Sequence, residues 1–313
     1  MISAIAESFR SLGNKQKVTL LVTDSGLGGL AVFAAMAARL EREPIFPDVS
    51  LIYYNAWPEQ DRGYHRLKDT AERIRVFDQA LLGMERFDPD IILIACNTLS
   101  VLYSRTAFCR RKSLPVVDIV GFGVDMIYEY LSGKSAATAM ILGTVTTITS
   151  DVHRLQLIEK GISPDRVVVQ ACDQLATEIE KGPTRDRVVQ LIGTYTGQAA
   201  RKLGPNQNDV VAALCCTHFG YCRDQIKDAL EKRIQRPVAI LDPNQRMADF
   251  LFVVRGKNRA DNLPLKLNLR VVSRIIWDQA KIDAIAGIIE KTSGKTAQAL
   301  RGYEQIPELF TLT

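Results

Sequence analysis

Short apolar runs alternate with longer amphipathic stretches along most of the chain. The runs are rich in Val, Ile and Leu, and their nearly continuous hydrophobicity is typical of parallel strands covered on both faces. They predict strands at residues 18–23, 49–54, 91–96, 116–120, 139–143, 166–171, 209–215 and 238–241. Helical periodicity between them predicts helices at 27–40, 67–86, 150–161 and 185–202, with a further strand at 265–272 and a helix at 276–291.

This alternation predicts an α/β fold built from open, doubly wound, mostly parallel sheets with helices on both faces. The length of 313 residues predicts two domains, because one domain usually takes roughly 100–200 residues. Gly121 and Gly123, on either side of Phe122, predict a boundary near residues 120–123, before a new helix. Ligands of such sheets bind beyond the carboxyl ends of the strands, so we expect the site directly after the apolar runs.

Composition removes several classes of function. Hydrophobic residues make up 47% and charged residues 24%, as in ordinary globular proteins. The net charge is only +5 and no dense Lys/Arg run occurs, so we expect no nucleic-acid partner. No apolar stretch reaches the roughly 18 residues that span a bilayer, and acidic Glu7 interrupts the first 17 residues, which argues against a signal peptide. We therefore expect a cytoplasmic protein that does not engage membranes, with its six cysteines present as thiols.

The first strand leads into the glycine-rich segment 24–31, DSGLGGLA. This segment matches the G-x-G-x-x-A form of a dinucleotide fingerprint. Asp24 would oppose a pyrophosphate, however, and the second strand ends at Asn55 without the acidic residue that binds a ribose. A small carboxylate held by the backbone N–H groups of the turn fits better, with Asp24 meeting an ammonium or supporting proton transfer. In the simplest alternative, Asp24 or Ser25 only caps the following helix.

Two cysteines follow buried strands and precede polar residues. Cys96 is followed by Asn97 and Thr98, and Cys216 by Thr217. A thiol where a strand opens into a helix is partly exposed and feels the positive end of the helix dipole, which favours the thiolate. One such cysteine is usually an inert core residue, but two at equivalent strand ends point to chemistry.

A metal site formed by Cys215, Cys216, His218 and Cys222 is the competing interpretation of this region. Neighbouring residues at the end of a strand point to opposite faces, so Cys215 and Cys216 should not share a metal ion. We therefore expect no metal, with Cys215 packed in the core and Cys216 facing the site.

Three motifs stand in order along the chain: DSGLGGL at 24–30, ACNT at 95–98 and CTHF at 216–219. Together they resemble the glutamate racemase branch of the Asp/Glu racemase family. Weaker matches extend the resemblance over roughly residues 18–252, at 143–150, 171–172, 179–182 and 242–243. The resemblance implies two α/β lobes with the active site in the cleft between them. It implies that residues 1–118 and 242–313 form one lobe and residues 119–241 the other.

The resemblance also implies inversion of an amino acid at its α-carbon without a cofactor. Without pyridoxal phosphate, racemisation needs one group on each face of the α-carbon, one as thiolate and one as thiol. Cys96 and Cys216 fit these roles, whereas the single-cysteine decarboxylases of the wider superfamily protonate from one face. The resemblance further implies that Asp24 assists Cys96, and that His218, with Glu180 nearby, assists Cys216. The substrate-binding residues that it implies are Ser25, Asn97, Thr98, Thr147, Thr217, Gly63 and Tyr64.

Two departures from the family pattern bear on the substrate. The loop that carries Pro-Tyr-Gly in the family reads WPEQDRGYH here, at residues 57–65, with Gly and Tyr reversed. Phe219 and Gly220 replace the family's Tyr and Pro after the second cysteine. Arg62 in the altered loop could contact a side-chain carboxylate, although a solvated arginine is the default interpretation.

The sequence therefore predicts a cofactor-independent racemase with glutamate as the first substrate to test. The alternatives are a racemase-fold enzyme for another acidic substrate and a non-catalytic protein that binds an acidic metabolite. In each case the partner is a small amino acid or dicarboxylate, and the oligomeric state stays open, with a homodimer as one option.

His218 could also be a simple cap or core residue, whereas we expect His65 and His153 to be ordinary surface or packing residues.

Overall fold

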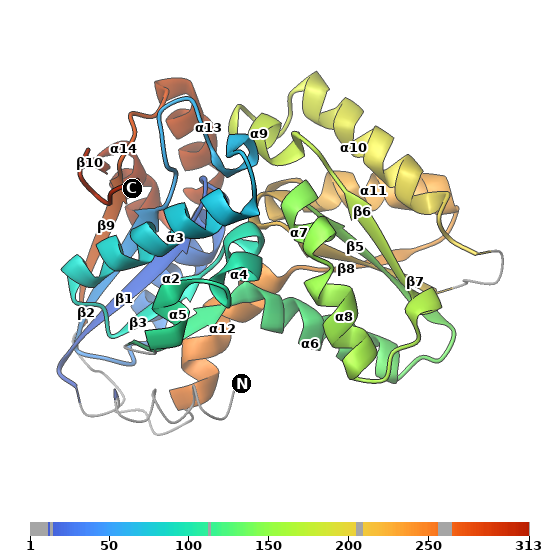
Figure 1. Ribbon diagram of the computed structural model, residues 1–313, viewed down its shortest axis with the longest axis horizontal. Helices are drawn as coiled ribbons and strands as arrows, with labels where there is room; N and C mark the ends of the chain where they lie inside the picture. Colours follow the sequence, from blue (N-terminus) through green and yellow to red (C-terminus); the bar gives the residue numbers. More distant parts are fainter. Residues whose placement is uncertain (1–11, 13–14, 112–113, 205–208, 256–264, 313) are drawn as a thin grey trace. The chain divides into compact units, whose positions relative to one another are not determined.

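The computed structural model describes residues 12, 15–111, 114–204, 209–255 and 265–312, so most of the N-terminal extension lies outside the described residues. The chain divides into two compact units: Met1–Asp118 with Gln245–Thr313, and Ile119–Asn244. In Figure 1 the blue N-terminal strands and the red C-terminal elements lie in the same unit, while the lime-green and yellow segments lie in the other. The chain passes back into the first unit after Asn244, whereas the resemblance implied a crossing after residue 241.

Within the described residues, the first unit contains a six-stranded parallel sheet in the order β10-β9-β2-β1-β3-β4. Its strands are β1 (Lys17–Asp24), β2 (Asp48–Asn55), β3 (Ile91–Ile94), β4 (Val116–Asp118), β9 (Lys266–Ser273) and β10 (Glu304–Gln305). Strand β9 pairs with β2 along its whole length, from Lys266 beside Asp48 to Ser273 beside Asn55. The C-terminal part of the chain therefore completes the sheet that the N-terminal part begins.

The helices of the first unit follow its strands in the expected α/β order. They are α2 (Leu30–Arg42), α3 (Thr70–Met84), α4 (Asn97–Tyr103), α5 (Ala107–Arg111), α13 (Gln279–Ile289) and α14 (Gly294–Arg301). Helix α12 (Pro243–Arg255) begins in the second unit and continues into the first. Short 3₁₀ turns at Tyr64–Arg66 (η1) and Glu85–Phe87 (η2) complete the connections.

The described part of the second unit contains a four-stranded parallel sheet in the order β6-β5-β7-β8. Its strands are β5 (Ala137–Gly143), β6 (Val167–Ala171), β7 (Asp209–Cys215) and β8 (Val238–Leu241). Its helices and turns are α6 (Ile119–Ser132), α7 (Val145–Ser150), α8 (Val152–Glu159), η3 (Pro164–Arg166), α9 (Leu175–Glu180), α10 (Asp186–Ala200), η4 (Thr217–Cys222) and α11 (Arg223–Ile234). Both sheets are parallel and both alternate with helices, which confirms the predicted α/β fold class.

The predicted strands are present because their apolar runs are the most buried parts of the molecule. Every residue of β5 is buried, as is every residue of β3. Strand β1 is buried from Leu20 to Asp24, and β7 from Val210 to Cys215. The polar residues at these strand ends therefore follow directly after buried strands. Among the described helices, none combines the length and the apolar character that a membrane crossing requires.

Two predictions about helices were wrong. The glycines at 121 and 123 do not precede a helix, because α6 begins at Ile119 and runs through both. A Cβ added at Gly121 would meet no neighbouring atom within 4 Å, so this glycine marks neither a turn nor a close approach. The predicted helix at 150–161 is two helices, α7 and α8, separated at Asp151, whose φ of 57° lies in the left-handed region and ends a helix.

Candidate functional site

The predicted site residues gather where each sheet reverses its winding. In the first unit β1 lies between β2 and β3, and in the second β5 lies between β6 and β7. Ligands of doubly wound sheets bind beyond the carboxyl ends of the strands at such a point, which here are β1 and β3 in the first unit and β5 and β7 in the second. The structure thus brings the predicted residues together in two groups, one in each unit.

The turn after β1 is organised around the buried carboxylate of Asp24. The N–H of Gly26 donates a hydrogen bond to Oδ1 of Asp24 at 2.8 Å. A Cβ at Gly29 would lie 2.8 Å from Cβ and 3.0 Å from Oδ2 of Asp24, so the turn needs glycine there for space. Helix α2 begins at Leu30 with Gly29 as its N-cap and no side-chain capping bond. The Asp24 carboxylate thus binds the turn that leads into α2.

Residues at the end of β2 also form hydrogen bonds with this turn. The carbonyl of Gly26 accepts hydrogen bonds from Oη of Tyr53 at 2.6 Å and Nδ2 of Asn55 at 2.8 Å. Oδ1 of Asn55 in turn accepts from the hydroxyl of Ser273 at 3.1 Å. In the sequence Asn55 stood out only because it is not the acidic residue that binds a ribose, since its partners Gly26 and Ser273 lie far from it along the chain.

Cys96 stands between β3 and α4 as the N-cap residue of that helix. Its side chain is 5% exposed, and its Sγ lies 3.1 Å from Oγ of Ser25, with which it shares a hydrogen bond. Burial raises the pKa of the Cys96 thiol and the charge of Asp24 raises it further, while the hydrogen bond to Ser25 opposes both. The balance keeps Cys96 protonated at neutral pH.

Buried polar atoms without a protein partner lie beside Cys96 in the chain and in the loop after β2. Neither Nδ2 nor Oδ1 of Asn97 has a hydrogen-bond partner among the described residues, and the same holds for Oη of Tyr64. All three atoms are inaccessible to solvent. Because an unpaired buried polar group costs about 1–3 kcal/mol, such atoms are ready to pair with a ligand. Thr98 follows Asn97 and is also buried.

The altered loop after β2 is a closely packed structure. A Cβ at Gly63 would lie 2.6 Å from the indole of Trp57, so glycine lets the loop fold over this ring. Arg62, considered as a contact for a substrate carboxylate, instead binds both oxygens of Glu72 at 2.9 and 3.0 Å. Its guanidinium is also 3.4 Å from Glu59, so two glutamates already occupy it.

The second unit carries a chain of three titratable side chains. Sγ of Cys216 lies 3.7 Å from Nδ1 of His218, and Nε2 of His218 lies 2.8 Å from Oε1 of Glu180, the last residue of α9. All three residues are buried. Burial lowers the pKa of His218, but the hydrogen bonds and charges of Cys216 and Glu180 outweigh it and raise this pKa well above its usual value. His218 is thus a bridge between thiol and carboxylate rather than a helix cap.

Threonines follow directly after β5 in the second sheet. Thr144 caps α7 and shares a hydrogen bond between its Oγ1 and Oγ1 of Thr147 at 3.0 Å. Gly143 precedes them and pairs across the sheet with Cys215, which brings the Thr144 turn next to the Cys216 turn. Thr147 and Thr217 are both buried.

The remaining cysteines and histidines take no part in these groups. Cys215 and Cys172 are buried in the core as expected, and Cys109 is partly exposed on α5. Among the described residues, no three His, Cys, Asp or Glu side chains are arranged to hold a metal ion. His153 is a packing residue, with burial lowering its pKa to about 4, and His65 is exposed beside Trp57.

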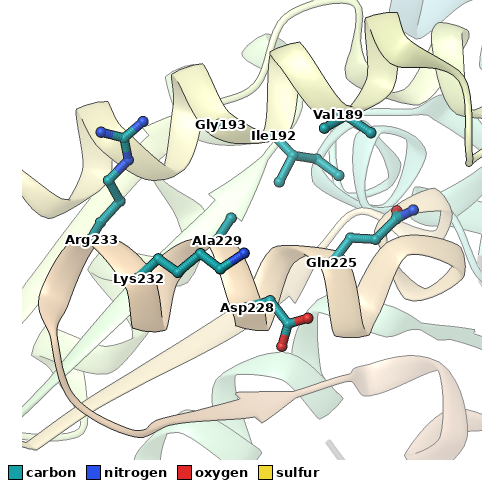
Figure 2. Close-up of a pocket in the computed structure, with 8 residues that line it drawn as sticks. All are labelled: Val189, Ile192, Gly193, Gln225, Asp228, Ala229, Lys232 and Arg233. Carbon is teal, nitrogen blue, oxygen red and sulfur yellow. The ribbon is translucent and has the colours of Figure 1, made fainter.

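A separate pocket of about 500 Å³ lies between α10 and α11 (Figure 2). Its lining comes from these two helices and includes apolar Val189, Ile192 and Ala229 together with Lys232 and Arg233. The predicted site residues do not line it. The predicted site residues thus lie at the strand ends, outside this pocket.

The sequence is similar to those of known racemases along most of its length. The sequence profile described as Asp/Glu/Hydantoin racemase matches residues 21–251. A glutamate racemase of Brucella anthropi is 28% identical over 265 residues, covering 83% of this chain and 88% of that protein. One from Paracoccus denitrificans is 25% identical over 292 residues, covering 90% and 96%.

A solved structure shares the fold. The glutamate racemase of Francisella tularensis, determined in complex with D-glutamate, superposes with a TM-score of 0.63 at 20% identity, covering 94% of this chain and 98% of that one.

Proposed function

This chain belongs to the Asp/Glu/Hydantoin racemase family, and we propose that it interconverts L- and D-glutamate without a cofactor. The observation that carries the proposal is the pair of strand-end cysteines, one in each unit. Each has a different proton partner: Asp24 and Ser25 beside Cys96, His218 and Glu180 beside Cys216. The proposal requires the two thiols to act on opposite faces of one α-carbon.

In the proposed reaction, one cysteine acts as thiolate base and the other as thiol acid. Cys216 is suited to start as the base, because a protonated His218 at 3.7 Å stabilises a thiolate. It takes the α-proton from one face, and the Cys96 thiol, which is held protonated, then delivers a proton to the other face. The opposite enantiomer requires the reverse assignment, with Cys96 as thiolate and Cys216 as thiol.

The carbanion that forms between the two transfers must be stabilised by the groups that hold the substrate. The unpartnered amide of Asn97 can bind one carboxylate oxygen and one ammonium hydrogen, because it offers both a donor and an acceptor. The hydroxyls of Ser25, Thr98, Thr147 and Thr217 are further candidates for the α-carboxylate. The hydroxyl of Tyr64 is the unpartnered donor in the altered loop and suits the distal carboxylate.

Hydrogen exchange in D₂O tests the proposal without assuming the substrate. The purified protein is incubated with single enantiomers of a panel of amino acids, and deuterium at Cα is followed by NMR together with optical rotation. We expect L- and D-glutamate to racemise with incorporation of deuterium. Exchange confined to another acidic amino acid would overturn glutamate as the substrate. Tight binding of an acidic metabolite with no exchange across the panel would overturn catalysis.

The proposal includes a cytoplasmic location, because a reaction that depends on two free thiols needs a reducing compartment. A homodimer is part of the proposal as well. Light scattering behind a sizing column decides between one and two copies.

A further inference from the structure

The turn that carries Cys216 and His218 packs against the segment through which the chain leaves the second unit. This turn is η4, Thr217–Cys222, and the leaving segment runs from Asp242 to Asn244. Both belong to the second unit, and the next residue, Gln245, already belongs to the first. Asn244 and Asp242 played no part in the site predicted from sequence beyond the match at 242–243.

Asn244 binds the peptide that separates the two reactive side chains. Its Nδ2 donates a hydrogen bond to the carbonyl oxygen of Thr217 at 3.0 Å, and Thr217 stands between Cys216 and His218. The side chain is 6% exposed, so water competes little for this bond. Its backbone N–H donates to Oδ1 of Asp242 at 3.0 Å, which fixes the turn that presents the amide.

Gly220 makes this contact sterically feasible. A Cβ at residue 220 would lie 2.8 Å from Oδ2 of Asp242 and 2.9 Å from Nδ2 of Asn244. Both atoms are the ends of side chains, so a Cβ at 220 would force the carboxylate of Asp242 and the amide of Asn244 to move. The glycine leaves room for both groups at a position where this chain departs from the family pattern.

We infer that Asn244 is a positioning residue that holds the Thr217 peptide and thereby sets the distance between Cys216 and His218, with Gly220 providing the room. The inference deepens the proposed function, since it concerns one of the two groups assigned to proton transfer. Through this hydrogen bond, the segment 242–244 contacts the turn that carries Cys216 and His218. Asn244 acts through the turn and does not need to touch the substrate.

Asn244→Asp is the sharpest test, because it keeps the size of the side chain and replaces the donor with an oxygen that repels the Thr217 carbonyl. We expect kcat/KM to fall about tenfold, with the loss mainly in kcat. Alkylation by iodoacetamide, mapped by mass spectrometry at neutral pH, gives a second readout. The alkylation rate at Cys216 should shift down by about tenfold as the contact with His218 lengthens, because the imidazole then supports the thiolate less. The alkylation rate at Cys96, in the other unit, should stay unchanged.

Asn268→Asp, at an exposed position on β9, is the matched control and should change neither readout. A folded Asn244→Asp protein with wild-type kcat/KM and a wild-type rate of alkylation at Cys216 would overturn the inference. Equal shifts at Cys96 and Cys216 would do the same, because they would indicate a general loosening. If no amino acid is racemised even by the wild type, the proposed function fails while the alkylation profile still tests the positioning role.

Gly220→Ala approaches the same contact with Asn244 intact and keeps the inference testable if Asn244→Asp does not fold. It should reproduce the shift at Cys216, whereas Gly193→Ala on α10, where a Cβ meets nothing within 4 Å, should not. In the double variant Gly220→Ala/Asn244→Ala the effects should be less than additive, since both break one contact. Full additivity, or a wild-type profile in Gly220→Ala, would contradict the inference.

Discussion

The two strand-end cysteines have the same topological position but opposite surroundings. Cys96 and Cys216 both follow a buried parallel strand beside the point where its sheet reverses, and each is 5% exposed. Cys96 faces a buried carboxylate that raises its pKa, whereas Cys216 lies next to an imidazole. The same backbone plan thus places the two thiols beside different partners, a carboxylate at Cys96 and an imidazole at Cys216.

This difference shows how a pair of identical side chains can begin a reaction as acid and base. A thiol next to a negative charge holds its proton, and a thiol next to a protonated imidazole gives its proton up. In the proposed reaction the neighbours, rather than the cysteines, set the starting state, and the binding of the opposite enantiomer must reverse it.

Removing either thiol should lower the rate of racemisation more than any other change. Cys96→Ser and Cys216→Ser should each lower kcat for racemisation by about 10³-fold or more, since a serine hydroxyl is a far weaker acid at either position. Polarimetry with glutamate measures the loss. Cys109→Ser, on α5 away from both groups, is the control and should keep wild-type activity. Turnover within tenfold of wild type in either site variant would remove the two-thiol assignment.

Glu180→Gln tests the Cys216 side of the comparison. The glutamate helps to raise the pKa of His218, so the imidazole stays protonated to a higher pH and loses its proton as pH rises through that raised pKa. The variant should lower this pKa, shift the alkaline limb of the kcat/KM profile to lower pH and cost about 10- to 100-fold at pH 8. Glu178→Gln, whose partner is the exposed Lys181, should leave the profile in place. An unshifted alkaline limb in Glu180→Gln would separate His218 from catalysis.

Gly29→Ala tests whether the Asp24 turn depends on close packing. A Cβ would meet Asp24 and Ala95 at 2.8–3.2 Å, so we expect about 1–3 kcal/mol lower free energy of unfolding in urea. Gly121→Ala, inside α6 with free space around it, should instead raise the free energy of unfolding by up to about 1 kcal/mol. Equal stabilities of the two variants would argue against a crowded turn.

Asp24→Asn should give the smallest change and tests the Cys96 side directly. Without the carboxylate charge, the pKa of Cys96 should fall, and its alkylation by iodoacetamide at pH 8 should become about threefold faster or more. The rate at Cys216 serves as the internal reference and should not change. A slower or unchanged rate at Cys96 would show that burial alone keeps this thiol protonated.

The strands were predictable because a strand buried on both faces must be apolar along its length, and no other element has that pattern here. The positions of Cys96 and Cys216 followed from the same rule, since they come directly after such runs. The split at Asp151 was not predictable, because one residue in the left-handed region leaves the helical periodicity on either side intact.

The supporting contacts were the hardest to anticipate. Asn55 holds Gly26 from a neighbouring strand, and Asn244 holds Thr217 across a gap of 27 positions in the chain. Periodicity carries no information about such pairs, which exist only after the sheets form. The space required at Gly29 and Gly220 is likewise a property of the fold, although the glycine at 220 was visible as a departure from the family pattern.

The pairing of β9 with β2 also dictates an order of events during synthesis on the ribosome. The second unit is one continuous segment, so it can fold as soon as Asn244 has left the exit tunnel. Until Lys266–Ser273 is made, the first unit has an open edge at β2, whose unpaired N–H and C=O groups could join another nascent chain. Strand β9 covers this edge once it has been made. Truncations before residue 273 should therefore aggregate rather than fold.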